Sequence, residues 1–330
     1  YVYAFIFVGI FEYASPISEL LRTLNISLPS IKNVYGATVI MSMALFPYIF
    51  LLTKAQLSSV GVGIFKAAKS LGNNNLTAIR KVILPSLWPA VIAGMALVIF
   101  ETISDFGGVS TLRVETFTVG IYDAWFGYQS YFSAAKLAGY LLLFVFFIVF
   151  ISKYFGANSN TLASKTAENF EKIELNKFNQ YAFSVTCFLI FVLVFCIPII
   201  QLLVWHFDNP SFNVSESLYL LFNSSILGVC AALFTVFFAM ALSLSYKNNS
   251  YIRPFISIAS SGYAVPGSVI SAALLIVFDF VFNTSITIYG VFGLILCLSL
   301  RFMTPAFNYI NASLANISRS AENALSTQPR

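Results

Sequence analysis

Apolar stretches long enough to cross a membrane recur along the whole chain, and shorter polar stretches separate them. A helix needs about 20 consecutive apolar residues to cross a hydrocarbon core of about 30 Å. The pattern therefore predicts an all-α fold, a polytopic transmembrane helical bundle. We expect spans, the first of them cut short, at residues 1–13, 35–57, 85–104, 133–152, 180–205, 218–245, 255–280 and 287–311.

Composition agrees with a membrane protein and excludes an ordinary soluble domain. Hydrophobic residues make up 58% of the 330 residues and charged residues only 9%, whereas a soluble domain has about 25% charged residues. Tyr1 lies inside an apolar run and Arg330 inside a polar one, so we expect the chain to be an internal fragment of a longer protein.

Basic residues are unevenly distributed between the two sides of the predicted bundle. The net charge of +5 is explained by basic inner loops beside anionic lipid, so we expect membrane lipid but no nucleic acid as a partner. The outer side keeps four cations, at Arg22, Lys32, Arg113 and Lys136. The positive-inside rule then assigns to the cytoplasm the segments with 13 of the 18 Lys and Arg residues, namely 54–84, 153–179, 246–254 and 312–330.

The chain lacks the side-chain patterns of common catalytic centres. Its four cysteines lie in apolar runs without a C-x-x-C spacing, and its single histidine, His206, ends an apolar run beside Trp205. One histidine cannot form a transition-metal cluster by itself, and neither a Ser-His-Asp arrangement nor a P-loop pattern is found. We therefore expect no enzymatic activity and no cofactor.

Two segments of the chain resemble each other. Residues 35–70 and 289–326 both begin with Tyr-Gly, continue as an apolar helix that contains a proline, and end in a polar stretch. An even number of predicted spans separates the two polar ends, so both ends emerge on the same face. The sequence therefore predicts two parallel internal repeats, unlike the inverted repeats of many secondary transporters.

A basic and polar stretch, KAAKSLGNNNLTAIRKVILP at residues 66–85, separates two apolar runs. Gly72 is a typical helix stop, Asn75 is placed to cap a second short helix, and Pro85 suits the start of the next span. We predict two short helices at nearly right angles on the cytoplasmic face.

This basic stretch has two possible roles. Ala67 and Ala68 have almost no side chain, which would let the groove of another protein approach closely. The alternative is an ordinary amphipathic helix that lies on the membrane surface and is held there by its basic residues.

The same stretch resembles the cytoplasmic EAA loop of ATP-binding-cassette (ABC) importer permeases. In that family the loop, here at residues 60–85, is a coupling helix that binds a cleft of the ATPase subunit. Lys66 stands where the family has glutamate. A second, partial loop at 312–330 contains Glu322 and Ala324. The resemblance implies ATPase-coupling roles for Lys66, Ala67, Ala68, Gly72, Leu84, Pro85, Glu322 and Ala324.

The run ETISDFGGVSTLRVETFTVGIYDAWFG at residues 101–127 resembles ferric-iron permeases of the fused two-half type. The resemblance implies a type I importer (MetI-like) fold, with a first half at 1–152, a cytoplasmic linker at 153–179 and a second half at 180–330. It also implies a cytoplasmic ABC ATPase dimer, a periplasmic ferric-iron-binding protein and a multi-pass location in the bacterial inner membrane.

Other functions remain open at this point. Sibling ABC permeases for thiamine, polyamine or sulfate share much of this plan. A secondary transporter, which needs no ATPase, and a non-transporting membrane protein belong to different classes.

Two carboxylates are candidates for a cation pathway. Glu101 and Asp105 stand four residues apart near the outer end of a span, so a helix would place both on one face. Ferric iron prefers carboxylate and phenolate oxygen. The alternatives are that Asp105 caps a helix or holds the Gly107-Gly108 turn, and that Glu101 pairs with Arg301 or a lysine.

Other polar residues at the outer side and in the spans have two interpretations each. Tyr122 and Asp123 either contact the binding protein or belong to an aromatic belt at the interface. Arg301, inside a span, either lines the pathway or forms a structural pair. Gly262, Pro266 and Gly267 indicate a broken or closely packed helix start, either a hinge for alternating access or small-residue packing, of which we favour packing.

Overall fold

The computed structural model describes residues 1–13, 15–72, 74–156, 176–208, 213–259, 262–282 and 290–316. Within these ranges the secondary structure is helical and no strand is found, which confirms the predicted all-α fold. Helices long and apolar enough to span a membrane lie at Val2–Thr23, Val34–Ser58, Ile79–Ser104, Tyr131–Ile151, Lys177–Asp208, Val214–Lys247 and Gly290–Leu314. Seven of the expected spans are thus found in the described part of the chain.

The remaining expected span, 255–280, is wrong as a single helix. Helix α12 (Arg253–Ala259) and a short 3-10 turn, η4 (Gly262–Ala264), come before α13 (Gly267–Phe282). Pro266 lies directly before α13, where its lack of an N–H is tolerated and its carbonyl accepts bonds from Val269 and Ile270. The helix is therefore interrupted by a proline that can start a helix but not continue one.

The chain divides into two compact units, described separately below. Unit 1 comprises Tyr1–Val119 and Phe146–Phe212, and unit 2 comprises Gly120–Val145 and Asn213–Arg330. Each unit contains parts of both expected permease halves, and the division at 153–179 stays a prediction. Most of that linker, 157–175, lies outside the described residues.

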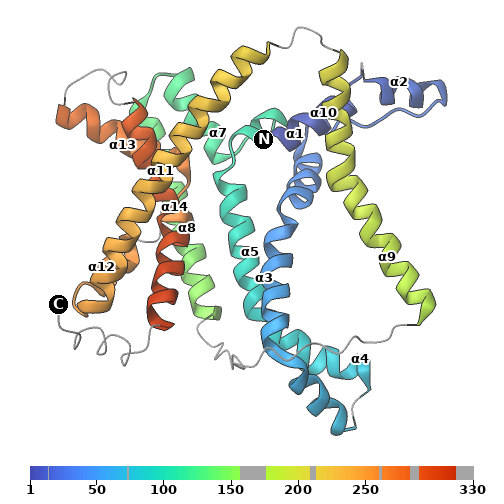
Figure 1. The fold of residues 1–330 in the computed structure, drawn as a ribbon. Helices are drawn as coiled ribbons and strands as arrows, with labels where there is room; N and C mark the ends of the chain where they lie inside the picture. The colour runs from blue at the N-terminus through green and yellow to red at the C-terminus, as the bar shows by residue number, and fades with distance from the viewer. Residues whose placement is uncertain are drawn as a thin grey trace. The chain divides into compact units, whose positions relative to one another are not determined.

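Unit 1 is built around a pair of long helices, α3 (Val34–Ser70) and α5 (Leu84–Ser104), which run side by side (Figure 1). A Cβ atom at Gly94 of α5 would lie 2.7 Å from the Cα of Ile49 in α3, so only glycine permits this approach. The other helices of unit 1 are α1 (Val2–Phe11), α2 (Pro16–Thr23), α4 (Asn75–Ala78), η1 (Ile79–Ile83), α6 (Gly107–Thr111), α9 (Lys177–Phe191), η3 (Val192–Cys196) and α10 (Ile197–Asp208).

The core of unit 1 lies where α1 meets α3 and the end of α6. Its buried residues include Phe7 and Ile10 of α1, Ile40 of α3, and Leu112. Tyr3 also donates a hydrogen bond of 3.0 Å to the carbonyl of Val194. Helix α1 thereby joins segments that are far apart in sequence.

Unit 2 is centred on α11 (Val214–Asn248) packed against α14 (Gly290–Asn316). Buried side chains of Ala239, Met303 and Phe307 form part of their contact. Gly262 lies against the backbone carbonyl of Leu300 in α14, where a Cβ atom would clash. The close packing we favoured for Gly262 is therefore present. Two boundaries between the units fall within α7 (Phe117–Tyr122) and α8 (Tyr131–Gly156), which flank η2 (Asp123–Gly127), and the third lies directly before Asn213.

Candidate functional site

The basic stretch at residues 66–85 forms the tip of the α3–α5 pair, at the bottom of Figure 1. Helix α3 continues without a break from the apolar span to Ser70, so the separate first short helix that we expected is wrong. The helix is continuous here because the residues between the span and the tip are compatible with a helix and include no proline after Pro47. We call the end of α3, α4 and η1 together the hairpin tip, residues 60–72 and 74–83.

Gly72 ends α3 as the sequence predicts. Its N–H donates a hydrogen bond of 2.9 Å to the carbonyl of Lys69, and its φ of 82° lies in the left-handed region that glycine adopts most easily. No atom lies within 4 Å of the position where a Cβ atom would be added. The tip is therefore open at this glycine.

The returning arm begins one residue earlier than we expected. The carbonyl of Asn74 accepts a 2.9 Å hydrogen bond from the N–H of Ala78, and α4 starts at Asn75, so Asn75 is not the capping residue. A π-helical turn, η1, then leads directly into α5, where Pro85 stands within the first turn as predicted. Such turns are often found at functional sites.

Two alanines of the hairpin tip face inward. Ala68 is 4% exposed and Ala78 is fully buried, and α3 packs here against α4 and η1. The small side chain of Ala68 therefore packs within the chain, and its role in ATPase coupling stays a prediction. The side chains of Lys66 and Ala67, and both Glu322 and Ala324, lie outside the described residues.

The outward surface of the hairpin tip is apolar at its end and basic on its flanks. Leu71 is 82% exposed, and Lys69, Arg80 and Lys81 are exposed as well. Leu84 and Pro85, at the start of α5, are also exposed. Sequence reasoning missed Leu71, although a leucine directly before a glycine stop in a polar stretch was a signal for it.

The expected pairing of Glu101 and Asp105 on one helical face is wrong. Helix α5 ends at Ser104, and Asp105 is extended, with φ −71° and ψ 129°. Its Oδ2 accepts a hydrogen bond of 2.9 Å from the N–H of Val109, in the first turn of α6. This bond satisfies one of the amide groups that have no partner within a helix end, so the capping alternative describes Asp105.

The backbone of Asp105 is held as firmly as its side chain. Thr118 is buried and its hydroxyl donates a 2.7 Å hydrogen bond to the carbonyl of Asp105. A Cβ atom at Gly108 would lie 2.6 Å from Oδ2 of Asp105 and from Cε of Met41. We call residues 105–118 the Asp105 corner. Across the described residues, no group of three or more His, Cys, Asp or Glu side chains is placed to hold a metal ion.

The remaining candidates lie in unit 2. Tyr122 and Asp123 are exposed next to an aromatic group. In this group the rings of Tyr122 and Phe126 are tilted to each other with 4.9 Å between their centres, and Trp125 meets Tyr131 edge to face at 4.8 Å. Both the aromatic belt and a docking role fit this exposure. Arg301 projects from α14 toward the start of α13, where a Cβ atom at Gly267 would lie 3.0 Å from its Nη1.

Residues 1–160 match the family of binding-protein-dependent transport system inner membrane components. Over 296 residues the chain is 27% identical to an Fe(3+)-transport system permease protein of Haemophilus influenzae, covering 87% of this chain and 58% of that protein. A sulfate transport system permease protein of Salmonella typhimurium is 36% identical over 74 residues, which is 22% of this chain and 27% of that protein.

A probable molybdenum ABC transporter permease protein of Haloferax volcanii is 25% identical over 104 residues, covering 32% of this chain and 38% of that protein. The chain thus spans less than two thirds of the length of each of these relatives. No solved structure matches the chain significantly.

Proposed function

We propose that the chain, whose residues 1–160 match the family of binding-protein-dependent transport system inner membrane components, is the permease subunit of an ABC importer. Its helices form a path across the bacterial inner membrane. The subunit itself hydrolyses no ATP. A cytoplasmic ATPase dimer supplies the energy, and a soluble binding protein on the outer side delivers the substrate.

The hairpin tip is the observation that carries this proposal. It combines a strongly exposed Leu71 with exposed cations at Lys69, Arg80 and Lys81, and a glycine turn with open space around it. An exposed apolar side chain within a polar rim is the usual form of a protein-docking surface. We infer that Leu71 enters an apolar cleft of the ATPase and that the cations meet acidic groups at the rim of this cleft.

The two arms of the hairpin tip explain how movement of the ATPase would reach the membrane path. Helix α3 continues for 37 residues, which is about 55 Å at 1.5 Å per residue. The returning arm passes through α4 and η1 into α5. Close contact of Gly94 with Ile49 holds α3 and α5 together, so displacement of the tip moves both helices and changes which side of the path is open.

For the substrate we propose ferric iron. The similarity that covers most of this chain is to a protein named for Fe(3+) transport. Sulfate is the second candidate, because similarities to sulfate permeases cover shorter parts of the chain. Glu101, which is half-buried near the outer end of α5, is a pathway candidate, whereas the bonds of Asp105 support a structural role for that carboxylate.

The proposal is tested by purifying the full-length transporter and measuring ATP hydrolysis in nanodiscs. We expect a cytoplasmic ATPase to copurify and its hydrolysis to rise when an iron-loaded binding protein is added. A rise only with a sulfate-loaded binding protein would retain the permease and reject iron.

The same preparation separates the other classes of membrane protein. Substrate uptake driven by an ion gradient without any associated ATPase would indicate a secondary transporter. Absence of both ATPase association and substrate-dependent turnover would indicate a non-transporting membrane protein.

A further inference from the structure

Unit 1 has a second polar feature, at the end of α3 opposite to the hairpin tip. A cavity of about 340 Å³ lies between the end of α1, helix α2 and the segment that leads into α3. Three serines and three charged side chains, Glu12, Arg22 and Lys32, lie on its wall together with apolar side chains. We call it the outer cavity, because the predicted topology places it outside.

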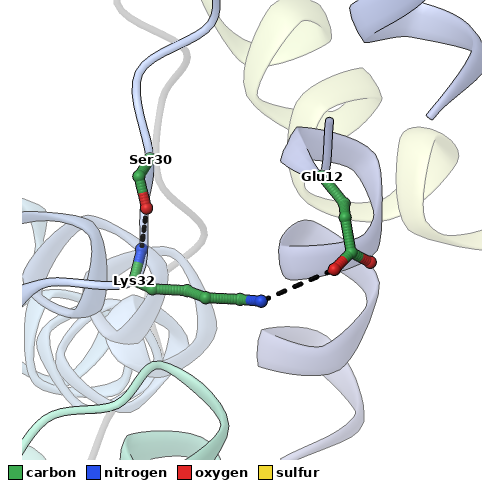
Figure 2. A network of polar contacts seen from close by, with 3 residues as sticks. All are labelled: Glu12, Ser30 and Lys32. Carbon is green, nitrogen blue, oxygen red and sulfur yellow. Dashed lines mark hydrogen bonds and ion pairs between the residues drawn. The ribbon is translucent and has the colours of Figure 1, made fainter. Parts of the chain in front are cut away.

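Lys32 is the cation that an incoming group can reach. Figure 2 shows its side chain extended toward Glu12, with 3.6 Å between Nζ and Oε1, while its backbone N–H donates to Oγ of Ser30 at 3.3 Å. An ammonium group has three donors, and a separation of 3.6 Å is long for a hydrogen bond. The side chain of Lys32 is 30% exposed and that of Glu12 is 58% exposed, so the lysine lies deeper in the wall than the carboxylate.

Arg22 donates two hydrogen bonds to neutral carbonyl groups. Its Nη2 donates to the carbonyl of Tyr13 at 2.9 Å, its Nε donates to the carbonyl of Ser18 at 3.3 Å, and its guanidinium lies 3.8 Å from the centre of the Tyr13 ring. These contacts fix the position of Arg22 and leave its charge unbalanced. The three charged groups on the wall therefore sum to one net positive charge.

The position of these cations within the membrane topology is unusual. The predicted outer side has four cations outside the spans, and two of them, Arg22 and Lys32, share this cavity. Outer loops generally contain few Lys and Arg residues. A pair of cations on the wall of one outer cavity, which has a single carboxylate among its lining residues, is complementary to one additional acidic group.

We propose that the outer cavity receives a carboxylate side chain of the soluble binding protein, which takes the place of Glu12 beside Lys32. The inference rests on the proposed function, because that function supplies the soluble partner and the outer orientation. Charge complementarity selects the occupant, and Arg22 adds a long-range attraction that steers the acidic partner toward the cavity.

The test measures the affinity of the full-length transporter in nanodiscs for the binding protein that activates its ATP hydrolysis. Lys32→Gln is expected to weaken binding about tenfold, because a hydrogen bond to a charged group is lost. Glu12→Gln is expected to strengthen binding about threefold, because the competing carboxylate is removed. Lys136→Gln, which removes another cation of the predicted outer side, is the matched control and leaves affinity unchanged.

The opposite signs distinguish docking from a structural ion pair. Both Lys32→Gln and Glu12→Gln remove the same ion pair, so a purely structural role would change both variants in the same direction and would overturn the proposal. An equal loss of affinity in Lys136→Gln would show that only net charge matters and would overturn the proposal too.

Loss of the Lys32→Gln effect in nanodiscs without anionic lipid would assign the cavity to a lipid phosphate and reject the carboxylate. If no binding protein activates the wild type, the proposed function itself fails.

Discussion

The hairpin tip and the Asp105 corner both interrupt apolar runs, one before α5 and the other after it. At the Asp105 corner the polar atoms face one another, through bonds from Val109 and Thr118 to Asp105. At the hairpin tip Ala68 and Ala78 face inward, whereas Leu71 and the described basic side chains are exposed. Both regions contain a glycine, but Gly108 is crowded and Gly72 has open space around it.

The contrast separates two uses of polar sequence in a membrane protein. Polar groups that bond to one another stabilise a turn of the backbone, because a buried unpaired polar group is costly. Polar groups that remain exposed around an apolar side chain contribute little to stability and are available to a partner. Substitutions in the corner should therefore reduce stability, and substitutions on the outer surface of the tip should reduce association.

Gly108→Leu should have the largest effect. The added side chain would collide with Oδ2 of Asp105 and Cε of Met41, and we expect a loss of about 3 kcal/mol in the free energy of unfolding. The melting temperature of detergent-purified protein measures this loss. Gly139→Leu, where no atom lies within 4 Å of the added Cβ, is the control. Equal melting temperatures for the two variants would contradict the crowded corner.

Asp105→Ala should cost about 1 kcal/mol, because it removes the acceptor for the N–H of Val109. Asp105→Asn keeps an acceptor oxygen and should retain most of the stability and substrate uptake. The two variants are compared by thermal melting and by transport into proteoliposomes. Normal stability of Asp105→Asn together with lost uptake would return Asp105 to the cation pathway.

Gly72→Ala should cost about 1 kcal/mol through backbone strain alone, because φ is 82° and space is open. Gly72→Asn should cost less, since asparagine adopts left-handed conformations more easily than alanine. Thermal melting again provides the measurement, with Gly127→Ala as a glycine control in open space and without a positive φ. A lower melting temperature for Gly72→Asn than for Gly72→Ala would contradict the role of the left-handed φ at this glycine.

Leu71→Ala should have the smallest effect on stability, within about 0.5 kcal/mol, because the side chain is 82% exposed. Its affinity for the ATPase should nevertheless fall about tenfold, because burial of the leucine at the interface is lost. Leu143→Ala, an exposed leucine of α8, is the control for general surface effects. Unchanged ATPase affinity in Leu71→Ala would remove Leu71 from the docking surface.

Local signals in the sequence predicted several features correctly. The stop at Gly72 and the helix start near Pro85 follow from backbone preferences of single residues, which do not depend on distant segments. Most of the spans were also predicted, because the length of an apolar run depends on the membrane and not on packing. The expected span at 255–280 was wrong as a single helix, although Gly262, Pro266 and Gly267 had indicated a broken or closely packed helix start.

Other features depended on neighbouring segments and could not be predicted from local sequence. The direction in which Ala68 faces is set by α4 and η1, which pack against α3. The spacing of Glu101 and Asp105 suggested one helical face, but bonds to Val109 and Thr118 stabilise an extended Asp105. Equal residue patterns can therefore have different geometries when an alternative hydrogen-bond partner is available.

By itself the sequence determined that this protein is a bundle of membrane-spanning helices and where the long helix of the hairpin tip stops. These features depend on apolar run length and on the conformational limits of glycine and proline. The tertiary structure alone decided which alanines are buried, that Asp105 bonds to α6, and that Arg22 and Lys32 share one cavity with Glu12. Such contacts join residues from different segments, and side-chain hydrogen bonds and charge are satisfied only when those segments meet.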